Sequence, residues 1–171
     1  MFMGLRNISI IQGEYKVSAE TDVVFSTVLG SCIAACLHDP VRKIGGMNHF
    51  LLPGADPGAA NNIKYGAHSM EQLINAMLRA GADRYSIQAQ LFGGGNVMSG
   101  LSKIGAANAV FAKKFVQDEG FRLVETDIGG DKGRRLKFAP ATGRAECVRM
   151  APRVEDTLPP RKAAVGKVDL F

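Results

Sequence analysis

A run of β-branched and apolar residues, interrupted once by a Gly-Ser pair, limits the possible folds of this chain more than any other feature. It covers residues 23–37, with the sequence VVFSTVLGSCIAACL. Such a run predicts two strands separated by a sharp local turn. Asp39 and Pro40 then interrupt the pattern, and a second strand-like segment covers residues 44–52. Residues 32–52 are therefore predicted to form a β-hairpin.

Further helices and strands are predicted along the rest of the chain. Two segments carry apolar side chains at helical spacing and end at a glycine, which predicts helices over 69–80 and 103–119. The first of them begins with a capping box formed by Ser69 and Gln72. The segment 54–67 is rich in Gly, Ala, Pro and Asn and predicts a mobile surface loop. Four more strands are expected near residues 86–92, 121–128, 134–139 and 144–150.

Size and composition favour one soluble domain. The chain has 171 residues, of which 46% are hydrophobic, and this is enough for a substantial single core. We expect a domain over residues 1–150 and an extended, Pro-containing basic tail over 151–171.

Charge and cysteine content narrow the function classes. The formal net charge is +5, but no nucleic-acid reading module accompanies it, so we expect no nucleic-acid partner. No apolar stretch reaches the length of a signal peptide or of a membrane span. Three cysteines without a disulfide framework fit a reducing compartment. We therefore expect a cytoplasmic protein without membrane insertion.

The predicted hairpin brings a cysteine and a histidine together. If residues 39–42 form its loop, the antiparallel register places Cys32 directly opposite His49 and Cys36 opposite Gly45. Facing residues have Cβ atoms about 4.5–5.5 Å apart, so a thiol and an imidazole could form a hydrogen bond. An adjacent imidazolium would stabilise the attacking thiolate.

The backbone around the cysteine suggests where an oxyanion would bind. Gly30 and Ser31 directly precede Cys32, and their backbone N–H groups could point at a developing negative charge. The glycine-rich segment Gly93, Gly94, Gly95 and Asn96 lacks the ending of a phosphate-binding P-loop. We expect this segment to pack closely beside the substrate cleft.

Two other interpretations of these residues remain open at this point. Cysteines with apolar neighbours are commonly inert packing residues, and a single histidine near a strand is commonly structural. A metal site could draw on Cys32, Cys36, His38, His49 and His68. Their spacing does not follow the paired motifs of most zinc sites, so we expect no metal and no cofactor.

Several ordered motifs resemble those of the CheD family of chemoreceptor glutamine deamidases. The motifs are TVLGSC at 27–32, CLHDP at 36–40, GGMNHFLLP at 45–53, GEY at 13–15, FGGGN at 92–96, DIGGDKGR at 127–134 and FAPATG at 138–143. Together they extend over about residues 8–150. The resemblance implies an α+β fold with two packed mixed β-sheets flanked by helices, similar to the cysteine deamidase domains of some bacterial toxins.

The resemblance also implies a reaction and its residues. Cys32 would be the nucleophile and His49 its acid/base partner, with a nearby hydroxyl residue, either Ser26 or Thr27, completing the site. The substrates would be methyl-accepting chemotaxis receptors, whose glutamine side chains are hydrolysed to glutamate through a cysteine thioester. A non-catalytic alternative is a binding partner that stimulates a CheC-type chemotaxis phosphatase.

Overall fold

The computed structural model describes residues 2–97 and 102–151. The strands among these residues are β1 (Arg6–Ser9), β2 (Tyr15–Ser18), β3 (Val23–Leu29), β4 (Ile33–Asp39), β5 (Ile44–Asn48), β6 (Gln88–Gly93), β7 (Arg122–Ile128), β8 (Arg134–Ala139) and β9 (Arg144–Arg149). The helices are α1 (Ala60–Arg79), the 3₁₀ helix η1 (Arg84–Ser86) and α2 (Ser102–Asp118). Of the tail expected over 151–171, residues 152–171 lie outside the described residues, so its extended character stays a prediction.

The strands form two mixed sheets. One has four strands in the order β1-β3-β8-β9, and the other has five in the order β2-β5-β4-β6-β7. Each contains one parallel pair, β1 with β3 and β6 with β7, beside antiparallel neighbours. The expected α+β class with two mixed sheets is confirmed. Its likeness to toxin deamidase domains stays a prediction.

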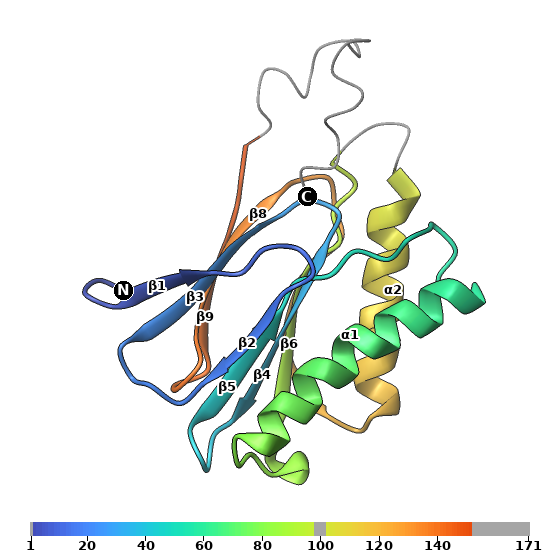
Figure 1. Ribbon diagram of the computed structural model, residues 1–171. Helices are drawn as coiled ribbons and strands as arrows, with labels where there is room; N and C mark the ends of the chain where they lie inside the picture. The colour runs from blue at the N-terminus through green and yellow to red at the C-terminus, as the bar shows by residue number, and fades with distance from the viewer. Residues whose placement is uncertain (1, 98–101, 152–171) are drawn as a thin grey trace.

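The five-stranded sheet is the middle layer of the molecule. Figure 1 shows α1 and α2 on one of its faces and the four-stranded sheet on the other. Side chains of β4 alternate between these layers. Ile33, Ala35 and Leu37 join the core beneath the helices, whereas Cys32, Ala34 and Cys36 join the core between the two sheets.

The predicted β4–β5 hairpin exists, but its register is wrong by two residues. Asp39 pairs with Ile44, so Cys36 lies opposite Met47 and not opposite Gly45. The reason is that the Asp39 side chain accepts hydrogen bonds from the N–H groups of the next turn, at 3.0 and 3.1 Å. Asp39 therefore remains in the strand and the loop moves to residues 40–43. A shift of two residues keeps every side chain on its predicted face.

Helix α1 corrects the prediction of a loop over residues 54–67. The helix begins at Ala60, well before the predicted capping box, and no side chain caps its first turn. Tertiary contacts stabilise this early start. Asn62 donates to the carbonyls of Gly54 and Asp56, and Gly66 lies so close to Phe111 that a Cβ atom would be 2.4 Å from its ring. The prediction relied on the spacing of apolar residues along the chain, and this spacing does not reflect such tertiary contacts.

Strands β1 and β2 are short, partly exposed, and were not predicted from the sequence. They belong to different sheets, so residues 10–14 between them cross from one sheet to the other (Figure 1). The remaining predicted strands and the second helix lie where the sequence placed them, within two residues at each end.

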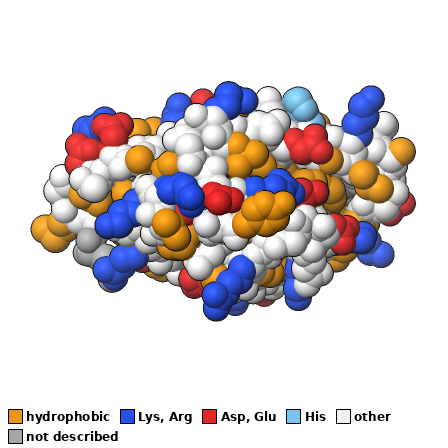
Figure 2. Space-filling view, turned by 90° about the horizontal axis from the view of Figure 1, so that it is seen from below, with side chains coloured by type: hydrophobic (Ala, Val, Ile, Leu, Met, Phe, Trp, Pro, Cys, Tyr) orange, Lys and Arg blue, Asp and Glu red, His pale blue; other side chains and the backbone are white. Residues whose placement is uncertain are grey.

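The surface carries both signs of charge. Figure 2 shows Lys and Arg side chains interspersed with Asp and Glu over the lower end of the molecule, with apolar side chains in small groups. Among the described residues, neither α1 nor α2 is long and apolar enough to cross a membrane.

Candidate active site

Cys32 lies in the turn between β3 and β4, directly before the first residue of β4. Its side chain packs between the two sheets and is 0% exposed. The next residue, Ile33, exchanges two backbone hydrogen bonds of 2.9 Å with Phe50. This pairing extends the β4–β5 register and makes Cys32 and His49 diagonal neighbours on the same face. The sequence predicted the shared face, although not the offset.

The turn that carries Cys32 is held from one side, which we call the rear support, by Gly94, Gly95 and Asn108. The N–H groups of Gly94 and Gly95 donate to the carbonyls of Cys32 and Gly30, at 2.8 and 3.0 Å. The side chain of Asn108, on α2, donates to the Ser31 carbonyl at 2.7 Å. Three consecutive carbonyls, 30 to 32, are thereby fixed.

The rear support also determines where two N–H groups of the turn point. All described peptide bonds are trans, and in a trans peptide the N–H points away from the carbonyl of the same plane. Because the carbonyls of Gly30 and Ser31 face the rear support, the N–H groups of Ser31 and Cys32 face away from it. An oxyanion role for these N–H groups stays a prediction.

The glycine-rich segment supports the backbone and does not supply such donors. The N–H groups of Gly94, Gly95 and Asn96 all donate to carbonyls, the last to Gly130 at 2.8 Å. At Gly93 the backbone has a φ of 109°, and a Cβ atom would lie 2.1 Å from the Cys32 carbonyl oxygen. The segment therefore packs closely against the turn that carries Cys32. Its place beside a substrate cleft stays a prediction.

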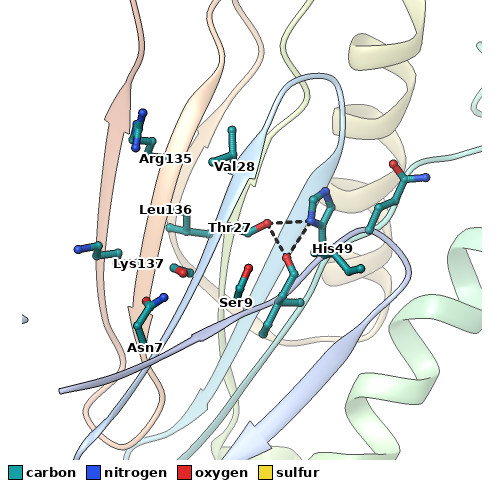
Figure 3. Close-up of a pocket in the computed structure, with 12 residues that line it drawn as sticks. Asn7, Ser9, Thr27, Val28, His49, Arg135, Leu136 and Lys137 are labelled. Carbon is teal, nitrogen blue, oxygen red and sulfur yellow. Dashed lines mark hydrogen bonds between the residues drawn. The ribbon is translucent and has the colours of Figure 1, made fainter. Parts of the chain in front are cut away.

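The His49 ring is oriented by two oxygens (Figure 3). Its Nδ1 lies 2.8 Å from Thr27 Oγ1 and 3.2 Å from the Ile10 carbonyl. The Thr27 hydroxyl donates to that same carbonyl at 2.6 Å, so it must accept from the ring. Nδ1 therefore carries the proton, and Nε2 is left with a lone pair. Nε2 is buried and has no hydrogen-bond partner within the described residues.

The structure distinguishes the two candidates for the third member of the site. Thr27 points inward and contacts the ring, whereas Ser26, its neighbour on β3, is partly exposed. The Ser26 backbone carbonyl accepts from the Ile10 N–H at 2.9 Å and, within the described residues, its side chain forms no hydrogen bond to the ring. Strand alternation places the two side chains on opposite faces.

The other side of the site is covered by Ile10–Gly13, which we call the front linker. Besides the Ile10 carbonyl, it contributes the Gln12 side chain, whose Oε1 accepts from Cys32 Sγ at 3.5 Å. The N–H of Gly13 donates to the His49 carbonyl at 2.7 Å. Consecutive residues of the linker thus contact the cysteine and the histidine.

Burial favours the neutral form of both groups. It raises the pKa of the Cys32 thiol to about 12, an effect that the backbone N–H of Cys32 partly opposes. Burial also lowers the pKa of His49, against the opposing influence of the Ile10 carbonyl and the Glu14 charge. Both shifts favour a thiol and a neutral imidazole over the expected thiolate–imidazolium pair, which stays a prediction.

A pocket of about 670 Å³ opens beside the contact between Thr27 and His49 (Figure 3). The front linker forms one wall, with Ile10, Ile11 and Gln12. The outer face of the four-stranded sheet forms the other, with Asn7, Ser9, Ser26, Val28, Arg135 and Lys137. The pocket thus connects an exposed basic surface with the imidazole.

Known proteins identify the family. Residues 51–149 match the model of the family described as CheD, chemotactic sensory transduction. A relative from Zymomonas mobilis is 55% identical over 83% of this chain and 79% of its own length. A relative from Caulobacter vibrioides is 47% identical over 96% of this chain and 92% of its own length. Both are named "Probable chemoreceptor glutamine deamidase CheD". The chain belongs to the CheD family.

A solved structure outside the CheD family shares the fold. The Neisseria meningitidis protein NMB0706, of the family DUF152, superimposes with a TM-score of 0.51 over 74% of this chain and 65% of its own. Only 13% of the aligned residues are identical, so the likeness concerns the fold alone.

Three residues that contribute to this CheD site were not predicted from the sequence. Ile10 acts through a backbone carbonyl, for which no sequence signal exists. Gln12 directly precedes the GEY motif, but its role depends on the path between the two sheets. Asn108 did carry a signal, because it is a polar residue on the apolar face of α2 and is 0% exposed.

The zinc interpretation finds no support in the described part of this CheD chain. Within residues 2–97 and 102–151, no three His, Cys, Asp or Glu side chains gather as a metal site requires. His38 is buried and bonds the Ala141 carbonyl at 3.2 Å, which is a packing role.

Proposed function

We propose that this chain hydrolyses the side-chain amide of glutamine residues on chemoreceptors, leaving glutamate and releasing ammonia. The observation that carries the proposal is the oriented His49 ring. Thr27 and Ile10 hold its Nδ1, while its buried Nε2 has no partner within the described residues and lies on the same face as Cys32. This is the arrangement that a general base for a neighbouring thiol requires.

In the first half of the reaction, His49 Nε2 accepts the thiol proton as Cys32 Sγ bonds to the amide carbon. The carbonyl π electrons move to oxygen, and the N–H groups of Ser31 and Cys32 stabilise the oxyanion. The intermediate then collapses, the carbon–nitrogen bond breaks, and His49 gives its proton to the departing ammonia. A thioester remains on Cys32.

In the second half, water takes the place of ammonia beside His49. The imidazole accepts a proton from the water while the water oxygen bonds to the thioester carbon. Collapse of this second intermediate breaks the carbon–sulfur bond, and the proton returns to sulfur. The receptor side chain leaves as glutamate and the resting thiol is restored. No step requires a metal or cofactor.

The substrate assignment rests on the names of the relatives, which are chemoreceptor glutamine deamidases. The pocket supports it, since Arg135 and Lys137 would attract an acidic protein segment toward the imidazole. Chemoreceptor signalling segments lie in the cytoplasm, so we place this enzyme there as well. Association with a CheC-type phosphatase is a separate role that would not depend on the thiol.

The test is deamidation of a receptor fragment, followed by mass spectrometry of its glutamine-containing peptides. We expect the wild-type chain to convert specific glutamines and Cys32→Ala to convert none. Cys36→Ala is the matched control, because Cys36 is buried in the same core but lies within β4, away from the turn that carries Cys32. Conversion by Cys32→Ala at the wild-type rate would refute the proposal.

A further inference from the structure

Access to Cys32 is closed in the resting structure. The cysteine is 0% exposed, although the reaction requires its sulfur to meet a protein side chain. On the front side, the sulfur is contacted by Gln12, an exposed residue whose Oε1 lies 3.5 Å from Sγ. An exposed amide thus covers a buried nucleophile.

The Gln12 backbone is fixed, but its side chain is held weakly. On one side the Ile10 N–H bonds to Ser26, and on the other the Gly13 N–H bonds to His49. Gly13 has a φ of 93°, which favours glycine, and lies in a turn closed by the Glu14 N–H, which donates to the Ile11 carbonyl at 2.9 Å. Among the described residues, the Gln12 side chain has the bond to Cys32 and no other. Rotation about its side-chain torsions would therefore remove the Gln12 amide from the sulfur at the cost of that one Gln12 hydrogen bond.

The Gln12 amide is held in an unreactive orientation. Its carbonyl oxygen faces the thiol, whereas attack requires the sulfur to reach the carbonyl carbon. A reacting amide would turn its oxygen toward the N–H groups of Ser31 and Cys32 and its nitrogen toward His49. Gln12 therefore occupies the space of a substrate glutamine without being consumed.

We propose that Gln12 is a displaceable cap that imitates the substrate glutamine and shields Cys32 until a receptor glutamine replaces it. This inference rests on the proposed function for the identity of the displacing group. The shielding itself is a property of the free protein and can be measured without a receptor.

The first test is the rate at which iodoacetamide alkylates Cys32 in the full-length protein, followed by peptide mass spectrometry. Gln12→Ala should raise that rate roughly 3- to 10-fold, the factor expected for loss of one hydrogen bond. Gln12→Asn keeps the amide but is one methylene too short, so it should resemble Gln12→Ala. Gln117→Ala makes the same chemical change on an exposed face of α2 and should leave the rate unchanged.

Cys36 serves as an internal control, since its labelling would report unfolding. If Cys32 is alkylated at the wild-type rate in both Gln12 variants, the proposal that Gln12 shields Cys32 is wrong. Conversion of Gln12 itself to glutamate during incubation would also overturn it, because that requires a reactive orientation.

The second test uses a receptor fragment. A cap that competes with substrate lowers the competent fraction of enzyme, so Gln12→Ala should lower KM by about the same 3- to 10-fold factor. An unchanged or higher KM would contradict the cap. Absence of deamidation by the wild-type chain would instead refute the proposed function, and the alkylation result would stand independently.

Discussion

The two sides of the Cys32 turn are built differently. The rear support holds three consecutive carbonyls with two backbone N–H groups and the buried amide of Asn108. The front linker meets the same turn through one long contact from an exposed side chain. The described contacts behind the nucleophile are therefore several and rigid, whereas the front linker contacts it through one flexible side chain. Changes at the rear should affect stability, and changes at the front should affect reactivity.

The largest expected effect is at the rear, in Gly93→Ala. A Cβ atom there would lie 2.1 Å from the Cys32 carbonyl oxygen, on a backbone with a φ of 109°. We expect a loss of more than about 3 kcal/mol in the free energy of unfolding, measured by urea denaturation.

Gly120→Ala separates this clash from backbone strain alone. Gly120 also has a positive φ, of 79°, but no atom lies within 4 Å of its Cβ position. The Gly120→Ala variant should lose about 1 kcal/mol in the free energy of unfolding, since only backbone strain is added. Equal losses in the two variants would show that the close packing behind Cys32 is unimportant.

A smaller effect is expected for Asn108→Ala, also at the rear. The Asn108 side chain accepts from the Leu52 N–H at 2.8 Å and donates to the Ser31 carbonyl. Its removal leaves the buried Leu52 N–H without that partner, at a cost of about 1–3 kcal/mol, and also removes the bond to the part-buried Ser31 carbonyl. Val110→Ala, at an exposed position of the same helix, should cost less than about 0.5 kcal/mol. Equal melting temperatures for the Asn108→Ala and Val110→Ala variants would contradict the claim that Asn108 stabilises the turn that carries Cys32.

At the front, Thr27→Val should change catalysis more than stability. It removes the hydroxyl that accepts from His49 Nδ1 at 2.8 Å, but the Ile10 carbonyl remains within 3.2 Å. We expect kcat to fall roughly 10-fold, the equivalent of one hydrogen bond. Thr27→Ser should restore the rate, and Ser26→Ala should not change it. A loss in Ser26→Ala equal to that in Thr27→Val would contradict the assignment of the third residue.

Local sequence patterns predicted much of this arrangement, and the failures have physical causes. Alternation of side chains along the strands placed Cys32 and His49 on one face of the sheet. The predicted register was wrong by two residues, and a shift of two residues leaves both side chains on that face. The same alternation could have selected Thr27, which shares its face with the buried Phe25 and Leu29. The error itself arose from the bonds that keep Asp39 in its strand.

Contacts between distant segments could not be predicted. The front linker acts on the site because β1 and β2 belong to different sheets, and neither strand carries a pattern strong enough to reveal this. Helix α1 begins early because of contacts with α2 and with the preceding loop. In both cases the cause lies in packing between elements, which periodicity along the chain does not encode.

The central claim is that neutral His49 acts as the base for a neutral Cys32 thiol, and the pH dependence of kcat/KM for receptor deamidation tests it most directly. Burial lowers the pKa of His49, so the ring stays neutral until the pH falls below the usual imidazole value of about 6.5. Activity should therefore be lost in one step below about pH 6.5, with no decline up to about pH 9, because the thiol pKa is raised. The acid step should vanish in His49→Gln, whose residual rate is low. A bell-shaped profile with an alkaline decline near pH 8, about where a thiolate–imidazolium pair loses its proton, would contradict the account.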